Sequence, residues 1–287
     1  MYAHRELKKL LVRICHFLAQ KDYVSAMDGN VSARLPDGTF LTTPTMIHKA
    51  FITEDDLIVV DGAGRKLAGP PERQPTSELF MHLACYQARS DVKAVVHAHP
   101  PTAIAFTIAG ESLARCVLPE VVLTLGQIPT APYKTTGTRD LAELVGQMMK
   151  QYDALLMDRH GVITVGKDLI DAFGKLEKVE HTAMITHRAR ALGKVKELDC
   201  QEVEKLRGLG KKYTGTGTLP PACEGCSGCP SRQPWQAQPT FEVGRISQHP
   251  SLGTTLPGML SGALGSDGLQ SLVLEEVLRA LATRTRG

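Results

Sequence analysis

Apolar residues recur along the chain with two different periods, and each period predicts a different kind of element. At residues 6–20 they recur at steps of three and four, which predicts an amphipathic helix. Further helices are expected at residues 79–89, 102–109, 139–152 and 168–192. Short apolar runs between turn signals predict strands at 31–35, 39–42, 57–60, 94–98, 154–157 and 162–166. These elements together indicate a mixed α/β domain.

Two segments rich in proline, residues 117–122 and 128–133, read as extended pieces. Because proline cannot donate a ladder hydrogen bond, we expect both segments at a sheet edge or at the rim of the domain.

Composition narrows the class of protein. The chain has 287 residues, 43% of them hydrophobic, and a net charge of +3, which gives no electrostatic sign of a nucleic-acid partner. No leader opens the chain and no apolar run is long enough to span a bilayer, so no membrane partner is expected. The seven cysteines are expected to be mostly thiols in a soluble protein of a reducing compartment.

Two histidines at the end of a buried strand are the first candidates for chemistry. His97 and His99 follow the apolar residues 94–96, and Pro100 ends the strand. Alternate side chains of a strand share a face, so the two imidazoles can bind one divalent metal ion. About twenty residues earlier, Thr76 or Ser77 is a natural N-cap for the next helix, and Glu78 lies in its first turn. The free N–H groups there suit a phosphate.

Several motifs, in order, resemble the class II aldolase/adducin family over about residues 7–213. Those motifs are Gly29-Asn30-Val31-Ser32, Thr43-Pro44-Thr45, Thr76-Ser77-Glu78, His97-Ala98-His99-Pro100, Ala131-Pro132-Tyr133, Gly137-Thr138-Arg139 and His160-Gly161. Within the family, the sequence is most similar to L-fuculose-1-phosphate aldolases. The resemblance implies a three-layer α/β fold with a central, mainly antiparallel sheet flanked by helices. It also implies a homotetramer with active sites at subunit interfaces.

The resemblance also implies a set of site residues. His97, His99 and His160 would bind one Zn²⁺ per subunit, and Glu78 would be the fourth ligand and the catalytic base. A substrate phosphate would be bound by Gly29, Asn30, Thr45, Thr76 and Ser77. The implied reaction cleaves a phosphorylated ketose, L-fuculose 1-phosphate or also L-rhamnulose 1-phosphate, into dihydroxyacetone phosphate and L-lactaldehyde. Zinc would act as a Lewis acid, and Glu78 would move a proton at the carbon beside the ketone.

Two positions depart from the family pattern. Met46 follows the Thr-Pro-Thr segment where the family often has glycine. No tyrosine occupies the region of residues 118–120, where the fuculose enzymes carry an acid. Glu120, Tyr133 and Tyr213 are the candidates for an acid or a substrate contact. The proton donor to the aldehyde oxygen stays unassigned.

The composition changes after residue 213, which divides the chain into an aldolase domain (1–213), a flexible linker (214–266) and an amphipathic helix (267–287). The linker contains Cys223, Cys226 and Cys229, a spacing that suits zinc or an iron–sulfur cluster. No fourth ligand follows closely, and Cys200 and His249 are distant candidates. The role of these cysteines stays open.

The predicted helix at 267–287 has an apolar stripe that needs a partner. One interpretation is that the helix docks on its own domain. The other is that it is an encapsulation peptide, which it resembles, and binds shell or cargo proteins of a bacterial microcompartment. The second interpretation implies a cytoplasmic protein in the microcompartment lumen. Other activities of the family are pentulose-5-phosphate 4-epimerase and methylthioribulose-1-phosphate dehydratase. The alternative that is not an enzyme is a non-catalytic, adducin-like interaction module.

Overall fold

The computed structural model describes residues 2–210, with side chains described from residue 5 onward. The chain divides into two units, residues 1–236 and 237–287, and every described residue belongs to the first. The predicted linker, the predicted helix at 267–287, Tyr213 and the cysteine run 223–229 therefore lie outside the described residues.

A single eight-stranded sheet forms the centre of the described structure, in the order β4-β3-β2-β1-β5-β8-β7-β6. Neighbouring strands are antiparallel except for β6 and β7, which pair in parallel. The strands are β1 Asn30–Arg34, β2 Phe40–Thr42, β3 Ile58–Val60, β4 Lys66–Ala68, β5 Ala94–Ala98, β6 Thr130–Ala131, β7 Ala154–Met157 and β8 Gly161–Gly166. The expected mainly antiparallel sheet is confirmed.

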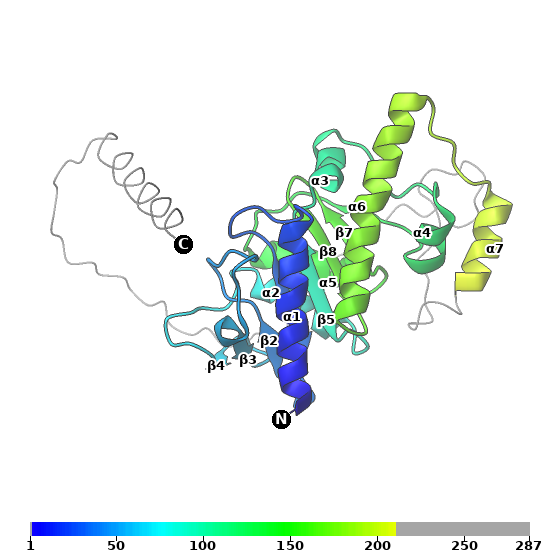
Figure 1. The fold of residues 1–287 in the computed structure, drawn as a ribbon. Coiled ribbons are helices and arrows are strands. Elements are labelled where there is room, and N and C mark those ends of the chain that lie inside the picture. The colour runs from blue at the N-terminus through cyan, green and yellow to red at the C-terminus, as the bar shows by residue number, and fades with distance from the viewer. Residues whose placement is uncertain (1, 211–287) are drawn as a thin grey trace, which may run out of the picture. The chain divides into compact units, whose positions relative to one another are not determined.

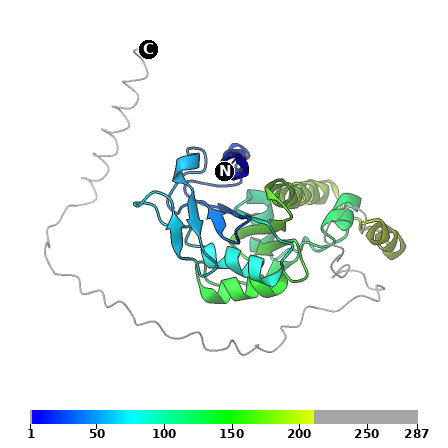
Figure 2. The same cartoon turned by 90° about the horizontal axis from the view of Figure 1, so that it is seen from below.

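Helices cover both faces of this sheet and complete three layers (Figure 1; Figure 2). α1 and α6 lie on one face, and α2 and α5 lie on the other (Figure 2). The helices are α1 Tyr2–Gln20, α2 Leu79–Ala88, α3 Pro101–Ile108, α4 Pro119–Thr124, α5 Arg139–Met148, α6 Leu169–Leu192 and α7 Cys200–Gly210, with a short 3₁₀ turn at Glu54–Asp56.

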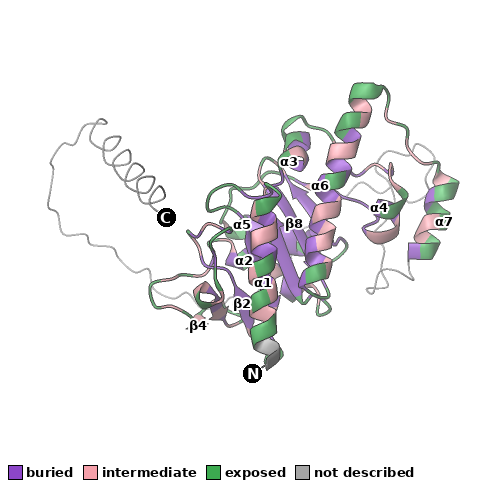
Figure 3. Ribbon diagram, viewed as in Figure 1, coloured by how far each residue is buried: buried purple, intermediate pink, exposed green. Residues whose placement is uncertain are grey.

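Side-chain alternation along β5 divides the interior into two cores, one on each face of the sheet. Val96 packs into the core beneath α1 and α6, whereas Val95 packs into the core beneath α2 and α5. The central strands are accordingly buried while the outer faces of α1 and α6 meet solvent (Figure 3). His97 shares the face of Val95, so it lies on the side of the sheet where α2 begins.

The expectation of an extended segment at 117–122 is wrong, because Pro119–Thr124 forms helix α4. Pro119 occupies the first turn, where its missing N–H is not needed, and the acidic Glu120 follows it. The other proline-rich segment does contain the edge strand β6, as expected.

No helix among the described residues is both long and apolar enough to span a membrane. Of the described cysteines, Cys15 and Cys85 are buried free thiols, in line with expectation. Cys116 and Cys200 differ from the expectation of free thiols, because both are disulfide-bonded.

Candidate metal centre

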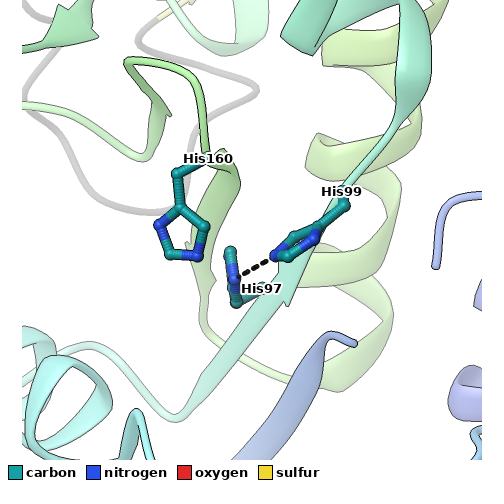
Figure 4. Close-up of side chains that lie close together, drawn as sticks. All are labelled: His97, His99 and His160. Carbon is teal, nitrogen blue, oxygen red and sulfur yellow. Dashed lines mark hydrogen bonds between the residues drawn. The ribbon is translucent and has the colours of Figure 1, made fainter. Parts of the chain in front are cut away.

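Three histidines from two neighbouring strands converge at one end of the sheet. His97 lies on β5, His99 directly follows that strand, and His160 immediately precedes β8. Antiparallel pairing of Ala98 with Val162 brings the ends of β5 and β8 together. The three ring centroids are 4.8 to 5.0 Å apart, and one nitrogen from each ring lies within 4.8 Å of the others. Figure 4 shows the rings turned toward a common point.

Gly161 permits this close approach. A Cβ atom built at Gly161 would lie 2.5 Å from the Ala98 carbonyl oxygen and under 3 Å from the rings of His97 and His99. Any side chain at this position would therefore push β8 and His160 away from the other two histidines.

Glu78 meets the histidines from the other side of the site. It is the N-cap residue of α2, so the expectation that Thr76 or Ser77 would occupy that position is wrong, although the Glu78 N–H does donate to Thr76 Oγ1 at 3.4 Å. Glu78 Oε2 lies 3.1 Å from His97 Nε2, and Glu78 Oε1 lies 3.2 Å from His160 Nε2. The carboxylate thus spans two of the three imidazoles.

A hydrogen bond fixes which nitrogen of His97 faces the site. His97 Nδ1 donates to the carbonyl oxygen of Val162 at 2.9 Å, so Nε2 points toward the other ligand atoms. His97 Nε2 is 3.0 Å from His99 Nε2, and Asp28 Oδ2 lies 3.4 Å from His99 Nδ1.

These residues fit a divalent metal ion. Three imidazoles with one displaceable carboxylate suit a catalytic zinc site, which has three protein ligands and a fourth position that water or substrate can take. Glu78 Oε1 and His160 Nδ1 are buried and have no hydrogen-bond partner within residues 5–210. A cation coordinated by Glu78 Oε1 would satisfy one of these two atoms.

Electrostatics at the centre favour a negative carboxylate beside the imidazoles. Burial alone would raise the pKa of Glu78, but the facing imidazoles of His97 and His160 hold it far below its usual range. Burial, together with the charges of His97 and His160, lowers the pKa of His99 to about 3. The pKa of His97 is raised in spite of burial, because Glu78 faces it.

Behind Glu78, a buried chain of hydrogen bonds runs from α2 to β1 and back. Asn30 Nδ2 donates to Glu78 Oε2 at 2.9 Å, and His82 Nε2 lies 2.6 Å from Asn30 Oδ1. His82 Nδ1 is 2.7 Å from Ser32 Oγ, which is 2.8 Å from Tyr86 Oη. Because Asn30 Oδ1 only accepts, His82 donates to it through Nε2–H and, when neutral, accepts from Ser32.

The residues expected to bind a phosphate gather around the start of α2. An isolated bridge between Pro44 and Pro75 sets Thr45 and Thr76 on adjacent segments. Gly29, at φ +73°, has no room for a side chain, because a Cβ would lie 2.5 Å from Val24. Ser77 is exposed, whereas Asn30 is 4% exposed and its amide already donates to Glu78. The phosphate role of these residues stays a prediction.

The candidates for an acid lie apart from the histidines or beyond the described residues. Glu120 is exposed on α4 and lines a cavity of about 320 Å³ together with Tyr23 and Lys178. Tyr133 follows β6 and is 57% exposed. Tyr213 lies outside the described residues. Among the described residues, neither Glu120 nor Tyr133 makes a hydrogen bond or ion pair with the three histidines or Glu78.

Sequence reasoning gave no role to His82, Ser32, Tyr86 and Asp28. A local signal for part of this set exists. His82 and Tyr86 follow Glu78 at steps of four and therefore share its helix face, and Ser32 shares a strand face with Asn30.

Comparison with known proteins agrees with this geometry. The family model "Class II Aldolase and Adducin N-terminal domain" matches residues 9–187. An L-fuculose phosphate aldolase of Methanococcus vannielii is 37% identical over 62% of this chain and 94% of its own length. A 3-oxo-tetronate 4-phosphate decarboxylase of Escherichia coli is 30% identical over 63% of this chain and 86% of its length. A solved L-fuculose 1-phosphate aldolase superposes with a TM-score of 0.65 at 30% identity, over 71% of this chain and 95% of that chain.

Proposed function

The chain belongs to the family of class II aldolases and adducin N-terminal domains, and from that premise we propose that it is a zinc-dependent lyase that cleaves L-fuculose 1-phosphate into dihydroxyacetone phosphate and L-lactaldehyde. The observation that carries this proposal is the convergence of His97, His99 and His160 with Glu78 at one end of the sheet. The similarity to L-fuculose phosphate aldolases supports the choice of substrate.

In this proposal the three histidines and Glu78 hold one Zn²⁺ per subunit. A bound zinc ion supplies Lewis acidity, which lowers the energy of the negative charge that bond cleavage leaves on the ketone oxygen. His97 keeps Nε2 turned inward because its Nδ1 donates to Val162.

Glu78 is the proposed base that takes up and returns a proton at the carbon beside the ketone. Next to His97 and His160 its pKa is far below the usual range, so it is a poor proton acceptor in that position. The carboxylate must leave the imidazoles before it can accept a proton, and substrate binding provides that displacement. Asn30 then holds Oε2 and limits how far the carboxylate moves.

The phosphate of the substrate is proposed to bind at the start of α2, where Gly29, Thr45, Thr76 and Ser77 are candidates. The positive end of the helix dipole and the free N–H groups favour a dianion there. Asn30 belongs to the same region, and we propose that it contacts both the substrate phosphate and Glu78. Glu120, Tyr133 and Tyr213 remain the proposed candidates for the acid.

An aldehyde-release assay tests the proposal. Zinc-loaded enzyme is expected to release L-lactaldehyde from L-fuculose 1-phosphate, with L-rhamnulose 1-phosphate as the second substrate. His99→Ala is expected to abolish release, whereas the exposed His187→Ala is expected to leave it intact. Wild-type protein that binds zinc but releases no aldehyde from either ketose would contradict the proposal.

A decarboxylase is the second candidate, because an Escherichia coli 3-oxo-tetronate 4-phosphate decarboxylase is 30% identical. Loss of carbon dioxide beside a ketone leaves the same negative charge on the ketone oxygen. Measuring both carbon dioxide and aldehyde from a panel of phosphorylated sugars separates the two. Pentulose 5-phosphate and methylthioribulose 1-phosphate in that panel test the epimerase and dehydratase alternatives. An inactive protein that binds no metal would favour the adducin-like alternative, which the complete ligand set argues against.

We also propose a homotetramer with active sites at subunit interfaces. Ile108 and Tyr133 are large apolar side chains that stay 62% and 57% exposed, which supports a partner surface. Light scattering of the full chain checks the mass, and a monomer that is fully active would contradict the arrangement.

The proposed domains are an aldolase domain (1–213), a linker (214–266) and an encapsulation helix (267–287) that places the enzyme in the lumen of a cytoplasmic microcompartment. The apolar stripe of the predicted helix supports this proposal. Fusing residues 265–287 to a fluorescent protein in shell-producing cells tests it. Punctate fluorescence is expected, and diffuse fluorescence would contradict encapsulation.

A further inference from the structure

Lys49 is a lysine whose charged end is buried. Its side chain is 1% exposed and is among the largest fully buried side chains of the described residues. Nζ donates to the carbonyl oxygens of Met27 at 3.1 Å and of Ile47 at 2.8 Å. An ammonium group has three N–H donors, so one of them has no acceptor within residues 5–210. Lysine is almost never fully buried unless it is paired, so this charge calls for an anion.

No buried anion in the described part of the chain neutralises Lys49. Asp28 acts on the ammonium without an ion pair, and its carboxylate is 48% exposed and faces His99. The thiol of Cys15 is neutral, because burial raises its pKa to about 12. Burial also lowers the pKa of Lys49, so an anion that bound nearby would stabilise the charged ammonium.

Lys49 joins the two loops that carry candidates for the phosphate site. Met27 lies two residues before Gly29, and Ile47 lies two residues after Thr45. Consecutive Cα atoms are about 3.8 Å apart, so each residue whose carbonyl Nζ holds lies within about 8 Å, Cα to Cα, of one of these candidates. The buried ammonium therefore lies beside both loops of the site.

The loop that carries Thr45 has a strained backbone. Met46 has a φ of +55° although it is not glycine, and its side chain is 71% exposed. Such a conformation persists only where the surrounding contacts hold it. Before Met46, the Thr45 N–H donates to the Gln74 carbonyl oxygen at 2.9 Å, and after it Lys49 holds the Ile47 carbonyl oxygen. Lys49 thus fixes one side of the strained loop.

We propose that Lys49 supplies the positive charge of the phosphate site and locks its two loops together, a role that rests on the proposed function. A phosphate monoester carries about −1.5 to −2 charges at pH 7. The candidates for contacting it are all neutral, namely Gly29, Asn30, Thr45, Thr76 and Ser77. A buried cation attracts a nearby anion more strongly than a surface lysine does, because less water screens the charges. Lys49 is a positioning residue in this account, and it acts on the phosphate from behind the loops.

Isothermal titration calorimetry of the zinc-loaded full-length protein tests this role without turnover. The probes are inorganic phosphate and dihydroxyacetone phosphate. Lys49→Met keeps an apolar stem of similar length but removes the charge and both hydrogen bonds, so Kd for both probes is expected to rise by at least about 10-fold. The exposed control Lys150→Met is expected to bind both probes as the wild type does. Zinc content is expected to be unchanged in both variants.

Two further variants separate charge from packing. Lys49→Gln keeps N–H donors for the two carbonyls but lacks the charge, so it is also expected to bind phosphate weakly, and it replaces the methionine variant where circular dichroism shows that variant unfolded. Lys49→Arg restores a cation and is expected to recover part of the affinity. If Lys49 served packing alone, the bulkier arginine would bind no better than methionine or glutamine.

Three results would overturn the proposal. The first is an affinity for both probes that is equal in the wild type and in the folded neutral variants. The second is an arginine variant that binds no better than the neutral ones, and the third is a wild type that binds neither probe. Because binding is measured, a protein that binds phosphate through Lys49 but releases no aldehyde would contradict the proposed reaction and leave this role in place.

Discussion

At the scale of single residues, the His82 side chain orients the Glu78 carboxylate through Asn30 and makes no side-chain hydrogen bond to a proposed metal ligand among the described residues. It is fully buried, and burial with the nearby charge of His97 lowers its pKa to about 3, so it is neutral at ordinary pH. A neutral His82 donates to Asn30 Oδ1, and this leaves only Asn30 Nδ2 to face Glu78. Without that donor, Asn30 can turn its carbonyl oxygen toward the carboxylate and repel it.

Replacing His82 tests this positioning role. His82→Leu removes both hydrogen bonds and is expected to lower kcat by about 10-fold to 100-fold, the usual cost of losing an outer-shell partner of a metal site. His82→Gln keeps a donor and an acceptor and is expected to recover part of the loss, with KM little changed in either variant. Equal losses of kcat in the leucine and glutamine variants would contradict an orienting hydrogen bond.

The same histidine makes a prediction about acid stability. Below its ordinary pKa of 6.5 the unfolded chain binds a proton at His82, whereas the folded chain does so only near pH 3. The free energy of unfolding should therefore fall as the pH falls, by about 2 kcal/mol between pH 6.5 and about pH 5 from this group alone. Denaturant titrations should show a shallower fall in His82→Gln, while the exposed control His187→Gln should follow the wild type.

Replacing Glu78 is expected to reduce catalysis while leaving the protein folded. Glu78→Gln keeps the shape of the side chain but removes the proposed base, so kcat is expected to fall by about 100-fold to 10,000-fold. The three histidines remain, and zinc should still bind, though more weakly. The matched control is Glu143→Gln on the exposed face of α5, which should keep full activity. Near-wild-type turnover in Glu78→Gln would exclude Glu78 as the base.

At the scale of elements, the site exists because β5 and β8 run side by side and end together. Their apolar runs were predictable, since residues 94–98 and 154–166 contain few polar positions between turn signals. The pairing of β5 with both β1 and β8 could not be predicted, because it joins segments that are far apart in the sequence and no local signal indicates it. Helix α4 was missed because Pro119 among apolar residues fits an edge strand as well as a first helical turn.

The contact between β5 and β8 makes Gly161 a critical position. Gly161→Ala places a methyl group 2.5 Å from the Ala98 carbonyl oxygen and against His97 and His99, so the strands must separate. We expect a loss of about 1–3 kcal/mol in the free energy of unfolding, the usual range for overpacking, and a larger loss of zinc affinity. Gly208→Ala in α7 meets open space and serves as the control. Calorimetry measures both quantities, and unchanged zinc affinity in Gly161→Ala would contradict this account.

At the scale of the whole molecule, the centre assembles from three regions of the chain on one face of the sheet. His97 and His99 could be paired from their spacing on one strand, but Glu78 and His160 entered only through the family resemblance. No spacing rule connects Glu78 with His97 across a helix, or His99 with His160 across three helices and two strands. The buried chain through His82 was missed for the same reason, because half of its members lie on β1 and half on α2. Convergence of this kind is a property of the tertiary structure.

Because these side chains could hold a metal ion, we expect the stability of the molecule to depend on metal. Without a cation, the imidazoles of His97 and His160 both face the Glu78 carboxylate, and Glu78 Oε1 and His160 Nδ1 remain buried without a hydrogen-bond partner within residues 5–210. A ligand that binds only the folded state stabilises it by about 2.7 kcal/mol at a hundredfold excess over its Kd. Stripping zinc with a chelator should therefore lower Tm and abolish activity, and returning zinc should restore both. In His160→Ala the zinc-dependent rise in Tm should be largely lost, and a rise as large as in the wild type would mean that the metal stabilises the protein at another site.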